Sequence, residues 1–255
     1  MATIQDLSGS NLVDALRMPD REQLVAGMTE VELESGHVLY EPGDNVRYCY
    51  FPRFDAMATF HVAMANGSAI ETGLVGREGA IGGIVSQGRL PAFARASVMH
   101  GGSFYRISSS ALSAIKQANH RIAYLFARYA DCMLAQTFQS VACNAAHTIE
   151  QRSAKWLIAM IDRTGRSDVA MTQDELGSIL GVGRSYVSRV IQRLKRGGLI
   201  VTRRGHIEVI DEAGLRDQCC DCDSLVVDHF DTVLRGVYPS SDDANLDSVE
   251  QECAA

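Results

Sequence analysis

The chain has 255 residues, 46% of them hydrophobic and 22% charged, which is typical of a soluble globular protein with room for two domains. No apolar run reaches the length of a membrane span, the N-terminus lacks the regions of a signal peptide, and seven irregularly spaced cysteines do not form a secreted disulfide framework, so we expect a cytoplasmic protein. The formal net charge of the whole chain, −7, argues against nucleic-acid binding. Residues 147–206, however, hold eleven Lys and Arg against five Asp and Glu, a net charge of +6, which leaves −13 for the rest of the chain. A basic module attached to an acidic body is typical of a protein in which one domain binds phosphates.

The N-terminal half has the pattern of a small β-structure. The first 30 residues show a weak amphipathic pattern that Pro19 divides into two short helices at most. Strand-like runs then recur at intervals of about eight to twelve residues, with turn signals between them, and Asn66-Gly67 is a strong hairpin signal. This spacing predicts an antiparallel jelly roll or barrel. The expected strands are Val31–Leu33, Val38–Tyr40, Tyr48–Phe51, Met57–Val62, Ser68–Val75, Arg95–Val98 and Phe104–Ile107.

A helix is expected from about Ala111, and a longer one from about Asn119 to Ala146. In the longer helix, side chains at alternating steps of three and four residues form a largely apolar stripe that suits a parallel two-helix seam. We predict that the chain forms a homodimer through this stripe; the alternative is that the stripe packs on the barrel. The stripe consists of Ile122, Leu125, Tyr129, Cys132 and Gln136.

A helix-turn-helix is the firmest prediction from the residues alone. After a hinge at Asn144–His147 and an amphipathic helix, Thr172 and Glu175 form a capping box that starts a short helix. Gly181-Val182-Gly183 supplies the bend, and a second helix runs to Gly197-Gly198. The residues expected to point inward are Leu176, Ile179, Leu180, Val187, Val190, Ile191 and Leu194.

The outer face of the second helix predicts contact with DNA bases. Arg184, Ser185, Ser188 and Arg189 lie at i, i+1, i+4 and i+5 near the N-terminus, which is the part of a recognition helix that enters the major groove. Arginine pairs bidentately with guanine. The alternative is a helical hairpin with a solvated basic face.

Two strand-like runs follow, Leu199–Thr202 and Ile207–Ile210, around the basic turn Arg203-Arg204-Gly205-His206. A hairpin directly after a recognition helix is a wing, whose basic tip meets phosphates, so this segment favours the DNA interpretation. The backbone contacts predicted from the basic side chains here are Arg193, Arg203, Arg204 and His206.

Beyond the wing, a short helix is expected to begin at Asp211, and the acidic tail 239–255 is expected to be disordered. Cys219, Cys220 and Cys222 form a dense thiol group that lacks a second pair at zinc-like spacing. We interpret them as a structural patch on a terminal helix, with oxidation sensing left open, and we predict no metal site and no cofactor.

Three stretches resemble the Crp/Fnr family of bacterial transcription regulators: CNAAHTIEQRSAKWLIAMIDRTG (143–165), MTQDELGSILGVGRSYVSRVIQRLKRGGLI (171–200) and RGHIEVIDEAGL (204–215). The likeness covers roughly residues 20–225. It implies an α+β fold with an antiparallel, cyclic-nucleotide-binding-like β-roll (jelly roll), a long dimerisation helix and a winged helix-turn-helix. It also implies a homodimer that binds a palindromic operator and contacts RNA polymerase. Arg184, Ser188 and Arg189 match the family's base-contact positions, and Thr172 and Gln173 match its backbone-phosphate contacts.

The sensor half departs from this resemblance. Cyclic-AMP-binding members use a Gly-Glu-Leu turn and a later Arg-Ser pair, whereas this chain has Gly79-Ala80-Ile81-Gly82 and then Arg89-Leu90-Pro91-Ala92-Phe93. Residues 1–48 also lack the cysteine cluster of the oxygen-sensing branch. We therefore predict a regulator that does not depend on cyclic AMP, with Arg89 and Arg95 as the candidate effector site for another anion.

The predicted domains are a β-roll sensor with its N-terminal helices (1–118), a dimerisation helix and hinge (119–146), a winged helix-turn-helix (147–225) and the acidic tail. We predict a DNA-binding regulator and not an enzyme. A constitutive or thiol-redox-responsive regulator of the same family is the alternative. A cupin-type metalloenzyme is a distant one, because His61 with Glu71 is a single ligand pair.

Overall fold

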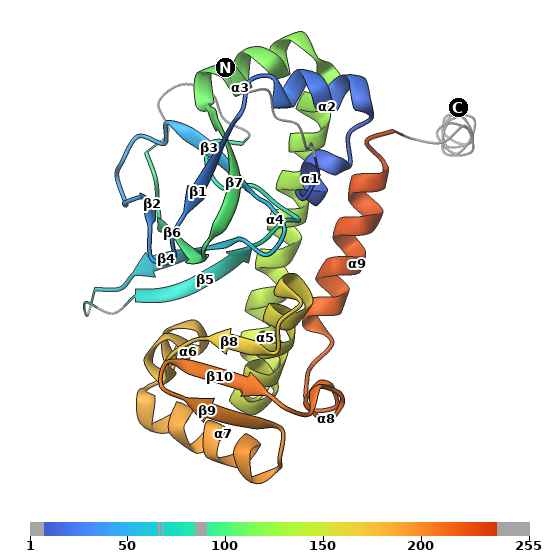
Figure 1. Cartoon of the computed structure of the whole chain (residues 1–255). Coiled ribbons are helices and arrows are strands. Elements are labelled where there is room, and N and C mark those ends of the chain that lie inside the picture. The colour runs from blue at the N-terminus through green and yellow to red at the C-terminus, as the bar shows by residue number, and fades with distance from the viewer. Residues whose placement is uncertain (1–7, 66, 68, 85–90, 239–255) are drawn as a thin grey trace, which may run out of the picture.

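The computed structural model describes residues 8–65, 67, 69–84 and 91–238 (Figure 1). Two short helices, α1 (Asn11–Asp14) and α2 (Met18–Val25), precede the β-roll, as the position of Pro19 predicts. Among the described residues, no helix is both long and apolar enough to cross a membrane.

The β-roll consists of two antiparallel sheets, which confirms the predicted architecture. One sheet has the order β1-β7-β3 and the other β2-β6-β4-β5. Burial alternates along β6, where Ala96 and Val98 are buried, whereas the four residues Cys49–Pro52 of β3 are all buried. The strands are β1 (Thr29–Leu33), β2 (Val38–Tyr40), β3 (Tyr48–Pro52), β4 (Met57–Ala63), β5 (Ala69–Val75), β6 (Arg95–His100) and β7 (Gly102–Ser108). β4 and β5 pair on either side of the Asn66-Gly67 signal, of which Asn66 lies outside the described residues.

Helix α3 (Ser109–Ala118) leads from the roll into the long helix α4 (His120–Ala146), which crosses the length of the molecule (Figure 1). Each helix begins at a side-chain cap: Ser108 accepts from the amide of Ala111, and Asn119 accepts from the amides of Arg121 and Ile122. The predicted limits of α4 agree with the structure to within one residue.

The stripe of α4 that was predicted to form the dimer interface is largely buried inside the single chain. Ile122, Leu125, Tyr129 and Cys132 are fully buried within the single chain, where they share a core with the roll residues Phe51 and Tyr105. The side chain of Gln136, the last member of the stripe, donates to the carbonyl of Leu74 on β5 at 3.1 Å. Packing on the roll, the alternative kept open from the sequence, therefore accounts for these five residues.

A second stripe on the opposite face of α4 is exposed. Its members also follow steps of three and four residues: Tyr124, Ala127, Asp131, Leu134, Phe138, Val141 and Ala145. Leu134, Phe138 and Val141 are 51%, 64% and 65% exposed. The helix thus carries two heptad-like faces, and only contacts with the rest of the chain distinguish the one that is already used.

The C-terminal module consists of α5 (Ile149–Thr164), β8 (Asp168–Ala170), α6 (Gln173–Leu180), α7 (Arg184–Arg196), β9 (Ile200–Arg203) and β10 (His206–Val209). β8 was not predicted; it completes a sheet of order β8-β10-β9, so the wing has three strands. The inward side chains of α6 and α7 share one core with α5 and with Met57 and Leu74 of the roll. The module therefore packs directly against the roll.

Two helices complete the described chain: α8 (Glu212–Arg216) and α9 (Cys222–Arg235). The sequence predicted the start of α8 but not α9, which lies alongside α4 (Figure 1) and buries Phe230 against Tyr129. The predicted disordered tail, 239–255, lies outside the described residues.

Candidate nucleic-acid interface

The turn between α6 and α7 is fixed by local chemistry. The Thr172 hydroxyl accepts from the amide of Glu175 while the Glu175 carboxylate accepts from the amide of Thr172, so the predicted capping box is formed. Gly181 ends α6 at φ +67°, a left-handed conformation that favours glycine. A Cβ on Gly177 would lie 2.9 Å from the carbonyl oxygen of Val182, so glycine also allows the close approach of the turn to α6.

Helix α7 presents its polar face to solvent. Val187, Val190, Ile191 and Leu194 are all buried, as predicted from their spacing. This burial anchors one side of α7 and leaves the other side free to enter a groove.

The predicted base-contact residues lie on that free side. The Arg184 side chain is 73% exposed, and its guanidinium lies 3.4 Å from the Asp174 carboxylate. Ser185 and Arg189 are exposed, and Ser188 is half-buried. The guanidinium of Arg189 stacks over the ring of Tyr186, 4.8 Å from its centroid. Tyr186, exposed at the same end of α7, was not predicted, although its position beside Arg184 and Ser185 was a usable signal.

The predicted backbone contacts are spread along the same side of the module. Arg193 pairs with Glu150 at 2.8 Å, and Arg203 pairs with Glu208 at 2.8 Å. Both guanidinium-bearing side chains are more than two-thirds exposed, so these pairs contribute little to stability and can be exchanged for phosphates at low cost. Arg204 is exposed beside Gly205, whose φ of +75° makes the wing turn.

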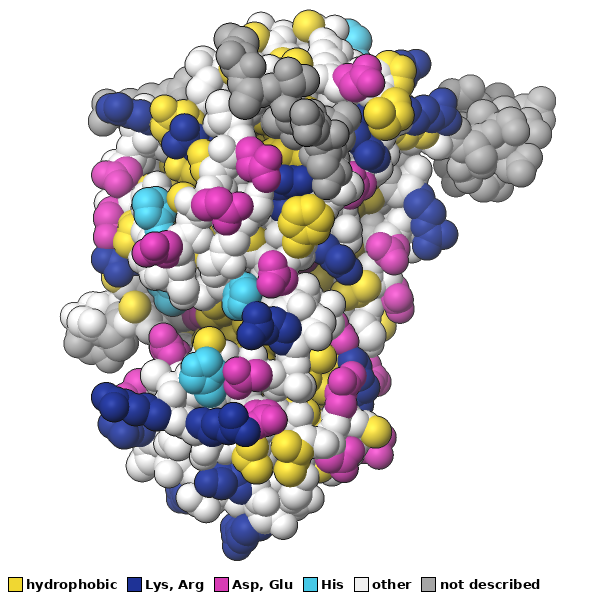
Figure 2. Space-filling model, viewed as in Figure 1, with side chains coloured by type: hydrophobic (Ala, Val, Ile, Leu, Met, Phe, Trp, Pro, Cys, Tyr) yellow, Lys and Arg dark blue, Asp and Glu magenta, His cyan; other side chains and the backbone are white. Residues whose placement is uncertain are grey.

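Thr172 and His206 also have local partners. The Thr172 side chain is engaged in the capping box, and Gln173 begins α6. His206 begins β10, and its Nδ1 lies 3.2 Å from a carboxylate oxygen of Asp168 on β8. Figure 2 shows Lys and Arg side chains gathered over the part of the molecule where Figure 1 places α7, β9 and β10.

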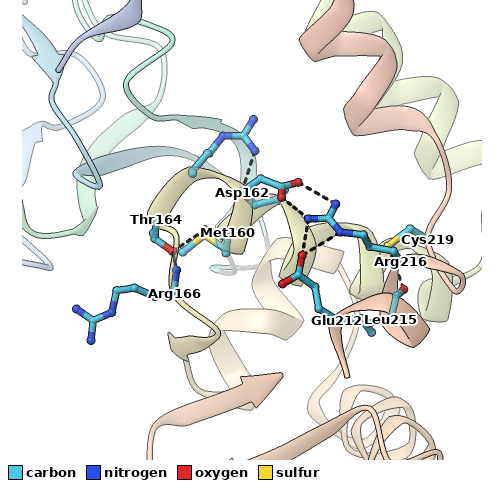
Figure 3. A network of polar contacts seen from close by, with 10 residues as sticks. Met160, Asp162, Thr164, Arg166, Glu212, Leu215, Arg216 and Cys219 are labelled. Carbon is cyan, nitrogen blue, oxygen red and sulfur yellow. Dashed lines mark hydrogen bonds and ion pairs between the residues drawn. The ribbon is translucent and has the colours of Figure 1, made fainter. Parts of the chain in front are cut away.

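Ion pairs hold this module in position. Arg216 on α8 reaches Asp162 on α5, with one nitrogen–oxygen distance of 3.2 Å, and also pairs with Glu212 (Figure 3). Arg163, the next residue of α5, contacts Glu78 of the roll at 3.0 Å and Asp223 of α9 at 3.5 Å. Burial favours the neutral form of the Glu78 carboxyl, but Arg163 and the backbone hydrogen bonds outweigh it and keep the pKa of Glu78 below its ordinary value.

The Gly79–Gly82 turn is in contact with a side chain of α4, that of Tyr129. The Tyr129 hydroxyl accepts from the amide of Ala80 at 2.9 Å and donates to its carbonyl at 3.1 Å. A Cβ on Gly79 would lie 2.3 Å from that hydroxyl, so the α4 side chain occupies the space next to this turn. The turn is thereby fixed to α4.

The structure describes only Arg95 of the two candidate effector residues. Arg95 binds the Glu41 carboxylate through two nitrogens, one of them at 2.8 Å, so its charge is already paired at the surface. Arg89 lies outside the described residues.

His61 and Glu71 are direct partners across β4 and β5. The Glu71 carboxyl is hydrogen-bonded to Thr59 and Trp156. Among the described residues, the one group of three or more potential metal ligands lies outside the roll.

Comparison with known proteins agrees with this architecture. Residues 151–218 match the model of the Crp-like helix-turn-helix domain. This stretch is a Crp-like helix-turn-helix domain. A search of curated proteins finds no match.

The fold of the chain is that of solved Crp/Fnr structures. FixK2 from Bradyrhizobium japonicum aligns with a TM-score of 0.64 at 16% identity, over 76% of this chain and 98% of that one. The c-di-GMP-responsive global regulator CLP of Xanthomonas campestris aligns with a TM-score of 0.63 at 16% identity, over 76% and 99%. A CRP-family transcriptional regulator from Thermus thermophilus aligns with a TM-score of 0.63 at 18% identity, over 74% and 95%. Residues 151–218 thus form a Crp-like helix-turn-helix domain, and the chain as a whole has the fold of these Crp/Fnr structures.

Proposed function

We propose that the chain acts as a homodimer that binds a palindromic operator, with α7 of each copy in a major groove and the wings against the flanking phosphates. The observation that carries this proposal is the exposed face of α7. Arg184 and Arg189 lie on this face, outside the core, although the chain as a whole has a negative net charge. Arg184 and Arg189 would read guanines, and Ser185 and Ser188 would reach other base edges or phosphates. Arg193, Arg203 and Arg204 would bind phosphates and set the register.

The second copy would pack on the exposed α4 stripe defined above. Leu134, Phe138 and Val141 present large apolar surfaces at heptad spacing, the arrangement by which two parallel helices form a seam. A two-fold axis along α4 matches the symmetry of a palindromic site. Asp131 within the stripe would weaken the seam locally, because two like charges would face each other.

We further propose that DNA binding does not require cyclic AMP. Tyr129 fills the space beside the Gly79–Gly82 turn, and the turn lacks the glutamate that would hold a ribose. Arg95 is paired with Glu41, so a cyclic phosphate would have to displace this carboxylate. RNA polymerase is the proposed protein partner, and the cytoplasm the proposed location.

Selection of genomic DNA fragments on the purified protein at physiological salt tests this function. We expect enrichment of an inverted repeat with half-site centres about one helical turn apart. The double variant Arg184→Ala/Arg189→Ala is expected to lose the motif, since each bidentate arginine–guanine pair is worth about 1–3 kcal/mol.

The matched control is Arg121→Ala/Arg235→Ala, which removes the same charge from exposed helix positions away from α7. It is expected to retain the motif. Enrichment without a motif would indicate electrostatic binding alone and contradict sequence-specific, effector-independent recognition. Adding cyclic AMP should leave the wild-type enrichment unchanged.

A further inference from the structure

Three cysteines and a histidine from distant parts of the chain meet at the hinge between α4 and α5. Cys143 and His147 lie four residues apart at the end of α4, and therefore on one face of it. Cys220 and Cys222 lie 73 or more residues further on, where the chain enters α9. The four potential ligand atoms lie within 4.8 Å of one another.

The spacing of these atoms fits a single tetrahedral metal ion. The Sγ atoms of Cys143 and Cys220 are 3.7 Å apart, and the Sγ of Cys222 is 3.5 Å from Nδ1 of His147. Zinc bonds of about 2.3 Å to sulfur and about 2.0–2.1 Å to nitrogen, at tetrahedral angles, place two sulfurs about 3.8 Å apart and a sulfur about 3.6 Å from a nitrogen. An iron–sulfur cluster would separate some of its ligands further, because its four ligands are shared among two or four irons.

The surroundings also suit a bound cation with thiolate ligands. The three cysteines form a buried cluster of their own, apart from the apolar cores. The side-chain amide of Gln139 donates to the Cys222 sulfur at 3.1 Å, and Nζ of Lys155 lies 3.4 Å from the Cys143 sulfur. Three thiolates, a neutral histidine and Zn²⁺ have a net charge of −1, which the Lys155 ammonium balances.

An ion has a path to this group. Two cavities, of about 460 Å³ and 510 Å³, adjoin it; Cys220 lines the first, Cys222 lines the second and Lys155 lines both.

We propose that Cys143, His147, Cys220 and Cys222 form a tetrahedral Cys₃His zinc site. Binding would convert three thiols to thiolates and release three protons, so that Zn²⁺ exchanges for 3 H⁺ at the site. This replaces our sequence-based interpretation of Cys220 and Cys222 as part of a structural patch, and it departs from our prediction of no metal. The second ligand pair was missed because it lies on α4.

The site would tie together the two ends of the DNA-binding module. Residues 148–219 form the loop between the two ligand pairs, so that one ion would join the chain where it enters the module to the chain where it leaves. Closing this loop limits the freedom of the module relative to α4. With four protein ligands the site is closed, which is the arrangement of structural rather than catalytic zinc.

Metal content of the full chain, purified under reducing conditions without chelators or affinity metals, tests the proposal. We expect one zinc per chain in the wild type and a loss of at least about tenfold in metal affinity for Cys220→Ser and Cys222→Ser. Cys219→Ser is the matched control, because the Cys219 sulfur donates to the carbonyl of Leu215 and lies outside the four-ligand group (Figure 3). It should keep its zinc.

Three further measurements keep the proposal testable if a variant fails to fold. Cobalt added to the zinc-free wild type should give the visible absorption of tetrahedral Co²⁺ with thiolate charge-transfer bands. His147→Cys keeps four ligands and should bind zinc, whereas His147→Ala should bind it more weakly. A chelator should lower the thermal midpoint of the wild type and of Cys219→Ser, but not that of Cys220→Ser.

Several outcomes would overturn the assignment. These are a wild type without zinc and without the cobalt spectrum, zinc content unchanged in Cys220→Ser and Cys222→Ser, or iron with inorganic sulfide in place of zinc. A Cys143–Cys220 disulfide in metal-free protein isolated from cells would replace the zinc site with a thiol-redox pair.

Discussion

Glu71 provides a quantitative test of how the roll contacts the DNA-binding module. It lies on β5, is 9% exposed, and is hydrogen-bonded to Thr59 of the roll and to Trp156 of α5. Burial raises the pKa of the Glu71 carboxyl from 4.5 to about 8; the hydrogen bonds oppose this change, and the nearby Glu175 adds to it. The folded protein therefore holds a proton here at neutral pH that the unfolded chain releases.

The sign of the pH dependence follows from this difference. Between pH 4.5 and about 8, Glu71 keeps its proton in the folded state and loses it in the unfolded state. The stability that Glu71 contributes is therefore fully present below pH 4.5 and is lost as the pH rises toward 8. The two pKa values differ by about 3.5 and each pH unit is worth about 1.4 kcal/mol, which sets a ceiling of about 5 kcal/mol.

Glu71→Gln has nearly the same shape and does not titrate, so it should abolish this loss. We expect its free energy of unfolding, relative to wild type, to rise by about 2 kcal/mol between about pH 5.5 and pH 7.5. Denaturant unfolding of both proteins across this range measures the difference, in which the other titrating groups cancel. Glu32→Gln, at an exposed position on β1, should follow the wild type.

A difference between Glu71→Gln and wild type that stays constant with pH would refute this reasoning. It would mean that Glu71 is ionised in the folded protein and that water reaches the contact between β5 and α5.

Two other predictions concern the contacts between subunits and between modules. Phe138→Arg, on the exposed stripe of α4, should convert the proposed dimer to monomer in sedimentation experiments, because the seam would have to bury two like charges. Val38→Arg, at a similarly apolar exposed position on β2, should leave the proposed dimer intact. A dimeric Phe138→Arg would contradict an interface on this stripe. Arg163→Met should lower the free energy of unfolding by about 2 kcal/mol, because Glu78 and Asp223 both lose their charged donor. An unchanged stability would show that water replaces the guanidinium without cost.

The sequence by itself determined the elements whose causes are local. The capping box of Thr172 and Glu175 and the left-handed Gly181 depend on residues within one or two turns, so they fix the helix-turn-helix before any distant contact forms. The strands of the roll were likewise predicted from short strand-like runs and turn residues, but their order within the two sheets was not.

Only the tertiary structure decided which faces and which distant residues meet. Both stripes of α4 have the same spacing, and the choice between them depends on the roll and α9, which cover Leu125 and leave Phe138 open. Helix α9 was missed because its stability comes from packing on α4 rather than from strong start and stop signals. Cys143 and Cys220 are separated by 77 residues, so no local spacing can reveal that they touch. The path of the chain through the DNA-binding module and back to α4 brings them together.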